Sequence, residues 1–430
     1  MPTIIQGAMN TQGGSLAGAS FEYEYPGDLD LRPGSKLHER IKREVLEKAR
    51  VSASIMRNRF DSWNEIDRVL TAYIDLSDSE KAIKGKDSRR PVSIVFPYSY
   101  AILESILSYL MTAFLQDPIF QYEGVSPEDT LGAILLEKVV EQHCQKFKVG
   151  LSLHTWFRDA LAYGMGVLTP TWRQQTGARL GEGGIFEGDQ ILFEGNALES
   201  IDPYLFLPDP NVSIHKIQDG EFVGWVSPDN YLNLLSSERR DALEVFNVKY
   251  LGLLKGRKTS IYSSDSSDRY KKTLGTNPRT ASDSVTSQVD VIYMYINLIP
   301  KEWGLGDSEY PEKWLFGVVS DEVVIKAKPL GLSHNLYPIA AIAPDFDGYS
   351  ITPQSRIEVL YGLQGVLDWL FNSHIANVRK VLNDMFIVDP YLVNIKDLED
   401  PKEGRIIKLR RPAWGKGVVN AIQQIVTGKQ

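Results

Sequence analysis

Two stretches in the first part of the chain carry apolar residues at helical spacing. One covers 35–75, with lysine, arginine and glutamate on its other faces, and it begins at Ser35, a residue type that caps helix starts. The other covers 96–115 and is apolar over most of its length. Because proline cannot continue a helix, Pro118 marks the end of this second predicted helix.

Helices and strands then follow one another in separate groups. Residues 118–125 predict a short strand. The sequence Ser-Pro-Glu-Asp at 126–129 predicts a helix start, with a capping serine, a proline in the first turn and acids at the positive end of the helix dipole. That helix extends to about Phe147, and a second amphipathic helix ends at Gly164 as a left-handed cap. Strand-rich runs come next, at 165–172 and 184–206. This order is typical of an α+β fold.

The middle of the chain predicts a β-meander. Residues 257–287 are rich in Ser, Thr, Asp, Lys and Arg and predict an exposed insertion. Strand character returns in three runs, with a tight turn at Ser320-Asp321 between the last two. The three runs are 289–298, 314–320 and 322–327.

The longest uninterrupted helical pattern of the second half covers 357–384, roughly 40 Å at 1.5 Å per residue. Its predicted apolar stripe consists of Ile357, Leu360, Tyr361, Leu367, Phe371, Ile375, Val378 and Leu382. The predicted polar face includes Glu358, Asp368, Asn372 and Arg379. Such a helix needs a partner surface, because it would otherwise expose a large apolar area. We therefore expect the stripe to pack against protein and the polar face to be wet.

Composition and charge narrow the class of protein. A chain of 430 residues with 43% hydrophobic content can hold about three structural units and should fold over most of its length. Cys144 is the only cysteine, so no intrachain disulfide is possible and a reducing compartment is expected. The formal net charge of −8 argues against wrapping of nucleic acid, but not against a channel through which DNA slides.

No targeting or membrane segment is predicted. The first 34 residues are rich in Gly, Ser, Thr and Asn and lack the basic and apolar regions of a secretion signal, so we expect a flexible segment. The run 96–115 has the length of a membrane span, but it carries Glu104, three serines and a leading proline. A carboxylate in mid-span is costly in lipid, so a protein-packed helix is the expected reading.

The chemistry of an enzyme is not found in the sequence. No glycine-rich phosphate loop, HExxH metal motif or G-x-S-x-G nucleophile elbow occurs. The paired aspartates Asp202/Asp209 and Asp345/Asp347 are more typical of loop turns than of an acid pair. We therefore expect no catalytic, cofactor-binding or metal site.

A cluster of charges near the end of the sequence leaves two interpretations open. Its basic residues alternate with acids, as on a solvated strand face. Alternatively, the cluster is a contact surface for DNA or an acidic partner, with Trp414 as an apolar anchor. The residues of this predicted contact surface are Lys402, Arg405, Lys408, Arg410, Arg411 and Trp414.

Several motifs taken in order resemble those of one protein family. LYPI at 336–339 and PDFD at 344–347 precede the long helix, which carries Gln364, Asp368 and Asn372 in one polar register. EGRIIKL follows at 403–409. Together with DALAYGMG at 159–166 and the loop from IDP at 201–203 to PDP at 208–210, this order resembles the portal proteins of tailed bacteriophages.

The resemblance implies an α+β, ring-forming subunit. A flexible segment (1–34) would precede a wing-like domain (35–355), a stem helix (356–384) and a small β-rich clip (385–430). Portals return from the clip through a second stem helix, so the end at Gln430 suggests either a portion of a longer protein or a fold without its second half.

The resemblance also implies a function. The chain would form a homo-oligomeric ring, a dodecamer, at one capsid vertex, through which double-stranded DNA is packaged and ejected. Glu358, Asp368, Asn372 and Arg379 would line the tunnel. The clip would meet the terminase and later the tail adaptor, with the capsid protein as a further partner. The protein would be found in the virion and, during assembly, in the host cytoplasm.

Two other classes stay open. One is another virion component, such as a scaffold protein, or a non-viral binding module. The other is an enzyme on an α+β fold, which has the least support because no catalytic constellation is found. A ring with a central channel would favour the portal interpretation, whereas a stable monomer would favour an enzyme.

Overall fold

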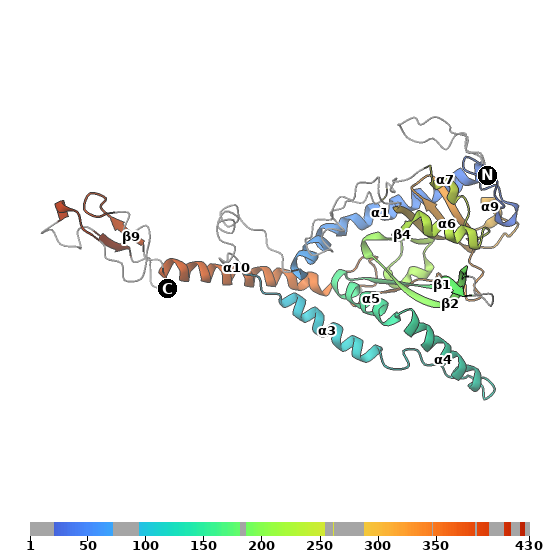
Figure 1. The fold of residues 1–430 in the computed structure, drawn as a ribbon, viewed down its shortest axis with the longest axis horizontal. Coiled ribbons are helices and arrows are strands. Elements are labelled where there is room, and N and C mark those ends of the chain that lie inside the picture. Colours follow the sequence, from blue (N-terminus) through green and yellow to red (C-terminus); the bar gives the residue numbers. More distant parts are fainter. Residues whose placement is uncertain are drawn as a thin grey trace. The chain divides into compact units, whose positions relative to one another are not determined.

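The computed structural model describes residues 21–71, 94–180, 186–253, 261, 288–345, 347–382, 385–394, 408–413 and 422–425. The chain divides into two compact units (Figure 1). Unit 1 contains Met1–Tyr73 and Pro97–Gly362, and unit 2 contains Ile74–Phe96 and Leu363–Gln430. The fold is α+β with open antiparallel sheets, as the order of sequence patterns predicts.

Helix α1 (Lys36–Leu70) opens unit 1. Ser35 caps it, since its hydroxyl accepts a hydrogen bond from the His38 amide at 3.2 Å. One face of α1 is buried, with Ile41, Val45 and Ala49 fully covered. The other α-helices described in unit 1 are α3 (Tyr98–Phe114), α4 (Thr130–Lys146), α5 (Val149–Tyr163), α6 (Tyr231–Arg240), α7 (Val248–Leu251), α9 (Pro300–Trp303) and the first turns of α10 (Arg356–Leu382).

A five-stranded antiparallel sheet supports α1. Its strand order follows the sequence: β3 (Phe206–Pro208), β4 (Phe222–Asn230), β5 (Gln288–Leu298), β6 (Glu312–Val319) and β7 (Val323–Pro329). The predicted meander is therefore confirmed. Ser320 and Asp321 both have positive φ, of 50° and 60°, as a two-residue hairpin turn requires.

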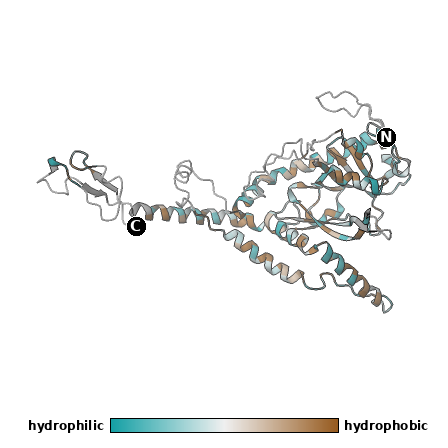
Figure 2. Cartoon of the chain, in the orientation of Figure 1, coloured by the Kyte–Doolittle hydropathy of each residue, from teal (hydrophilic) through white to brown (hydrophobic). Residues whose placement is uncertain are grey.

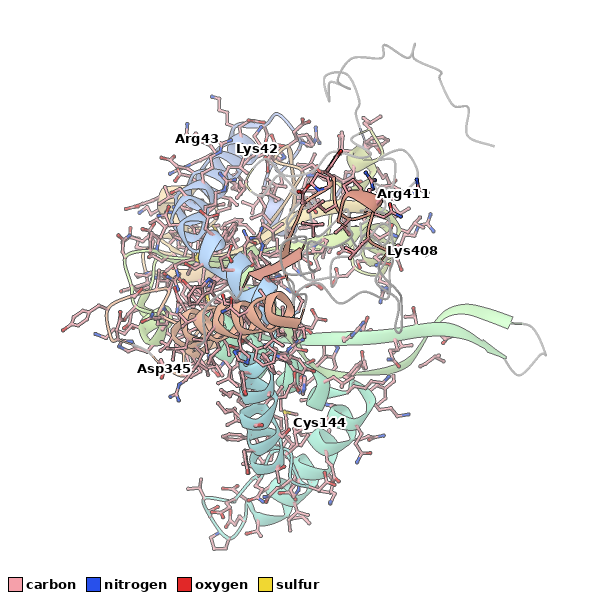
Figure 3. The ribbon with its side chains drawn as sticks, turned by 90° about the vertical axis from the view of Figure 1, so that its left-hand side faces the viewer. Lys42, Arg43, Cys144, Asp345, Lys408 and Arg411 are labelled. Carbon is pink, nitrogen blue, oxygen red and sulfur yellow. The ribbon has the colours of Figure 1, made fainter. Side chains whose placement is uncertain are left out.

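A second sheet is built on one long hairpin, β1 (Gly166–Leu180) and β2 (Phe186–Ile201), which run side by side (Figures 1 and 3). The short strand β8 (Ala340–Ile342) pairs with the start of β1. Gly164, with φ of +83°, ends α5 as predicted and turns the chain into β1. A Cβ at this position would lie 2.5 Å from the Pro353 carbonyl oxygen, so only glycine fits without a shift.

A buried polar cluster joins α1 to α5 and to the 3-10 turn Pro203–Leu205. Asp67 is 6% exposed and accepts hydrogen bonds from the Tyr163 hydroxyl at 2.5 Å and from the Tyr204 hydroxyl at 2.8 Å. The indole of Trp63 packs against both tyrosine rings, with centroids 5.6 and 5.1 Å away. A buried carboxylate of this kind is stable only when its oxygens are hydrogen-bonded.

Two local predictions are wrong between α3 and α4. Residues 118–125 form no strand, and no strand of the described chain pairs with them. Ser126 does not cap the helix: the Asp129 amide donates to the Ser126 carbonyl in a turn, and α4 begins only at Thr130. The serine hydroxyl bonds to the Asp129 carboxylate at 2.8 Å, which removes it from the helix end.

Helix α3 is only half buried. Leu103 and Leu107 are covered, whereas Tyr98, Tyr109 and Phe114 are more than half exposed. The expected protein-packed helix is thus observed on one face and not on the other. Within the parts of the chain that the structure describes, no helix is long and apolar enough to cross a membrane.

Unit 2 contains most of α10 and a small β-structure. Strand β9 (Met385–Val388) pairs antiparallel with β10 (Ile422–Ile425). An isolated bridge joins Val393 to Leu409, and a 3-10 turn covers Arg411–Ala413. Of the predicted contact surface, Lys402, Arg405 and Trp414 lie outside the described residues.

Candidate functional site

The candidate site is the long helix α10, whose start is fixed within unit 1. Ser355 and Glu358 form a reciprocal capping box: the Ser355 hydroxyl accepts from the Glu358 amide at 2.9 Å, and the Glu358 carboxylate accepts from the Ser355 amide at 3.4 Å. The same carboxylate pairs with Arg59 on α1 at 2.5 Å. Ile357 is 1% exposed and packs into the core.

Within unit 2, a polar face of α10 holds the backbone of residues 94–96. The Asp368 carboxylate accepts the Phe96 amide at 2.9 Å. The Asn372 side chain accepts the Ile94 amide and donates to the Ile94 carbonyl, both at 3.0 Å, as a neighbouring strand would. The Phe371 ring meets the Phe96 ring edge-on, with centroids 4.5 Å apart.

The predicted division of the α10 faces is therefore observed only in part. Glu358, Asp368 and Asn372 were expected to be wet, but their side chains contact protein. Val378 is expected to be packed but is 41% exposed, whereas Phe371 is 37% exposed and contacts the Phe96 ring. For Asp368 and Asn372 the reason is that residues 94–96 present backbone hydrogen-bonding groups, which polar side chains satisfy and apolar ones do not.

The other residues assigned to the two faces of α10 have different outcomes. Ile357 and Leu360 pack as predicted, with Leu360 partly buried. Arg379 lies within α10, but the position of its side chain is outside the described residues. The tunnel-lining role of the four polar residues stays a prediction, since it concerns an assembly and not a single chain.

The opposite side of α10 carries an apolar stripe that nothing in the described chain covers. Leu363, Val366, Leu367 and Leu370 occupy positions i, i+3, i+4 and i+7, and we call them the α10 stripe. Their side chains are 65, 61, 47 and 59% exposed. Figure 2 shows hydrophobic residues along this helix. The sequence signal was present in this spacing, but of these four residues the predicted apolar stripe includes only Leu367.

The helical wheel explains how two apolar sets fit one helix. At about 100° per residue, the predicted stripe and the predicted polar residues fall on overlapping parts of the same half of α10. Residues 363, 366 and 370 lie on the other half. The half that contacts the chain's own backbone is thus of mixed polarity, whereas the bare half is apolar.

Only part of the basic cluster can be described. Lys408, Arg410 and Arg411 are exposed, and the backbone amide of Arg410 donates to the Leu392 carbonyl at 2.9 Å. Figure 3 labels Lys408 and Arg411 on this segment. Their exposure fits a solvated face and a contact surface equally, so both interpretations stay open.

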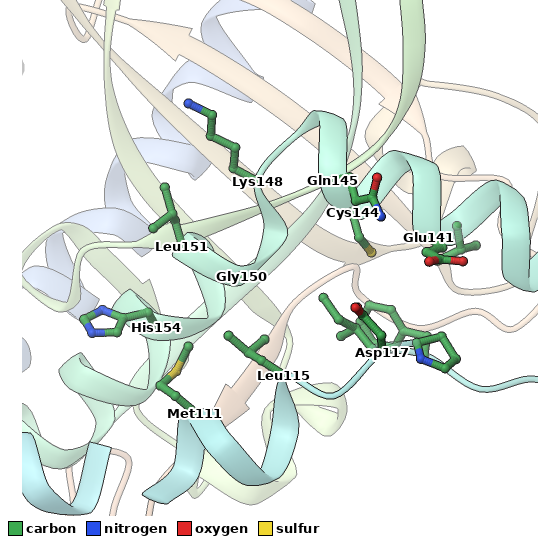
Figure 4. A pocket seen from close by; sticks show the side chains of 14 residues that line it. Met111, Leu115, Asp117, Glu141, Cys144, Gln145, Lys148, Gly150, Leu151 and His154 are labelled. Carbon is green, nitrogen blue, oxygen red and sulfur yellow. The ribbon is translucent and has the colours of Figure 1, made fainter. Parts of the chain in front are cut away.

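Two apolar pockets of about 410 Å³ each lie in unit 1. One is bordered by α3, α5 and the start of α10, and Arg356 and Asp345 form an ion pair at 2.5 Å among its lining residues. The other lies between α3, α4 and α5 (Figure 4). The sequence predicted neither, because each is assembled from segments far apart in the chain. No group of His, Cys, Asp and Glu among the described residues is arranged to hold a metal ion.

Comparison with known proteins does not identify a family: no family model matches the sequence, and no curated protein matches it.

Proposed function

We propose that this chain is a subunit of a homo-oligomeric ring of the portal type, through which double-stranded DNA is packaged and ejected. The order of motifs along the sequence supports the family, and the resemblance suggests twelve copies. The α10 stripe is the observation that carries the ring. Among the described residues nothing packs over the apolar face of α10, and a second copy of the chain would cover it.

Burial of the α10 stripe in an assembly would contribute considerable stabilisation. Full burial of a leucine or valine side chain stabilises by about 1.5–3 kcal/mol, so covering the half-exposed stripe residues contributes on the order of 1 kcal/mol each. Repeated around a ring, these contributions favour assembly over a monomer. We propose in the same way that a neighbouring copy covers the exposed face of α3, where Tyr109 is 79% exposed.

The charge of the chain suits a conduit better than a binder. Affinity for DNA comes mainly from lysine and arginine contacts with phosphates, and a net charge of −8 keeps such contacts few. A channel that held phosphates tightly would stall the passage of DNA. We therefore propose weak binding without sequence preference, since readout needs an element inserted into a groove.

The partners follow from the same proposal. A separate terminase would supply the energy of packaging, and a tail adaptor would replace it afterwards. The exposed residues Lys408, Arg410 and Arg411 are candidates for these contacts. The capsid protein would surround the ring, in the virion and in the host cytoplasm during assembly.

Native mass spectrometry of Leu370→Asp tests the proposal. An unpaired buried carboxylate costs several kcal/mol, so this variant should assemble at least about 100-fold less tightly than the wild type. Tyr349→Asp is the matched control, because Tyr349 is 91% exposed and outside the stripe, and it should assemble normally. A wild-type protein that stays monomeric, or an L370D variant that assembles like the control, would contradict the proposal.

A further inference from the structure

The exposed side of α1 carries a row of basic residues that the proposed ring contacts do not use. Lysine or arginine recurs at every seventh position from 36 to 57, and all four residues are exposed. Seven residues make almost two turns of helix, so the row drifts by only about 20° per step and stays on one side of α1. We call these residues the α1 basic row: Lys36, Arg43, Arg50 and Arg57.

The hydrophobic core holds this row in a fixed orientation. Ile41, Val45 and Ala49 lie on the opposite side of α1 and are fully buried, so the helix cannot turn about its own axis. Figure 1 shows α1 as one continuous helix. Because a helix rises 1.5 Å per residue, the four basic residues lie about 10.5 Å apart over a length of roughly 32 Å.

The charges of the α1 basic row are not neutralised by the described chain. Lys36 and Arg50 form no ion pair or hydrogen bond with another described residue. The Arg43 side chain is 71% exposed and approaches the Glu44 carboxylate only to 3.7 Å. An exposed pair of this kind contributes little. Arg57 donates to a backbone carbonyl, which leaves its positive charge in place.

This part of α1 is a local exception in an acidic chain. Residues 36–59 contain eight lysines and arginines against three glutamates, a formal charge of +5, whereas the whole chain has −8. Glu39 is already paired with Lys42 at 2.6 Å. Glu47 is the one acid that lies along the row, between Arg43 and Arg50, and it is exposed. The charge on this side of α1 therefore favours an anionic partner.

We propose that the α1 basic row binds the phosphate backbone of double-stranded DNA. DNA carries one negative charge per about 1.7 Å of its axis, and one turn of the B-form duplex is about 34 Å long, close to the length of the row. Evenly spaced cations on a rigid helix match a polymer of evenly spaced anions, whereas an acidic protein surface has no such repeat. Guanidinium groups also match the geometry of phosphate oxygens.

The expected binding is weak and independent of sequence. Contacts to phosphates alone carry no base readout, and three or four of them give an affinity that falls steeply with salt. The inference deepens the proposed function and rests on it only for the choice of DNA as the polymer. It names a surface that neither the α10 stripe nor the basic cluster near the end of the sequence includes.

Fluorescence anisotropy tests the row with the full chain and a labelled duplex of about 30 base pairs, three turns of B-form DNA. Each phosphate contact adds about 0.9 to the slope of log affinity against log salt, or about eightfold in affinity at 0.1 M salt. The double variant Arg43→Gln with Arg50→Gln should therefore bind about 60-fold less tightly, with a slope lower by about two. Glu47→Lys should bind more tightly, with a slope higher by about one.

Controls separate the row from the net charge of the protein. The double variant Lys216→Gln with Arg239→Gln removes the same charge at exposed positions outside α1 and should leave affinity and slope unchanged. Circular dichroism melts of R43Q/R50Q should match the wild type, because both side chains are exposed. Equal weakening in the control would overturn the row. Competition by polyglutamate as strong as that by DNA would assign the row to an acidic protein and overturn the DNA contact.

The same measurements distinguish this inference from the proposed ring. Rings in native mass spectrometry together with DNA binding that R43Q/R50Q weakens would support both. Rings that bind DNA equally well with and without the row, or that bind none at low salt, would overturn the α1 contact and leave the ring standing. A monomer whose DNA binding depends on the row would support the contact and contradict the ring.

Discussion

Removal of the Tyr163 hydroxyl tests the buried cluster that joins three elements of unit 1. In Tyr163→Phe, one oxygen of Asp67 loses a hydrogen bond of 2.5 Å while the carboxylate stays 6% exposed. Hydrogen bonds to charged groups contribute about 1.5–3 kcal/mol. We therefore expect a loss of about 2 kcal/mol in the free energy of unfolding, and a similar loss in Tyr204→Phe.

The losses in the free energy of unfolding of the two single variants should not be additive. Both hydroxyls bond to one carboxylate, so the double variant leaves a larger burial penalty on Asp67 than the sum of the single losses suggests. Urea unfolding followed by circular dichroism measures all three values at one pH. Single losses below about 0.5 kcal/mol, or simple additivity, would refute the view that these hydroxyls stabilise a buried carboxylate.

Three further predictions concern pH and chemistry. Burial opposes ionisation of Glu244, but hydrogen bonds from Lys326 and Lys328 outweigh it and lower the pKa of Glu244 to about 2. The ionised carboxylate therefore stabilises the fold above its ordinary pKa of 4.5, and this stabilisation should be lost as the pH falls from 4.5 towards 2. Thermal melts of Glu244→Gln should lack this dependence of stability on pH. Burial lowers the pKa of His38 to about 4, so on acidification the unfolded chain takes up a proton on this histidine before the folded chain does. Stability should therefore fall as the pH is lowered from about 6.5 to 4, and His38→Gln should show a smaller fall over the same range. Purified protein should show no steady ATP turnover, and turnover that persists through successive purification steps would contradict this.

The sequence predicts those parts of the fold that local rules determine. Ser35 caps α1, Gly164 ends α5, and the Ser320-Asp321 turn joins β6 to β7, because each depends on the backbone preferences of a few residues. At 126–129 the same reasoning failed, since the serine hydroxyl found the Asp129 carboxylate instead of a helix amide.

The candidate site depends on tertiary contacts that a pattern does not contain. The pattern of α10 predicts that Asp368 and Asn372 are exposed to solvent, but their side chains form hydrogen bonds with the backbone of residues 94–96, about 275 residues earlier in the chain. The apolar residues at 363, 366 and 370 were not recognised as a separate surface of α10, because they and the predicted apolar stripe both have helical spacing. Likewise, the pocket beside Cys144 exists only once α3, α4 and α5 meet.

Electron microscopy of the purified wild-type protein tests the central claim most directly. We predict rings of uniform size with a central channel wide enough for B-form DNA, in which the α10 stripe of every copy is covered by its neighbour. A protein that remains monomeric at micromolar concentration, with Leu363, Val366 and Leu370 still exposed to solvent, would contradict the account.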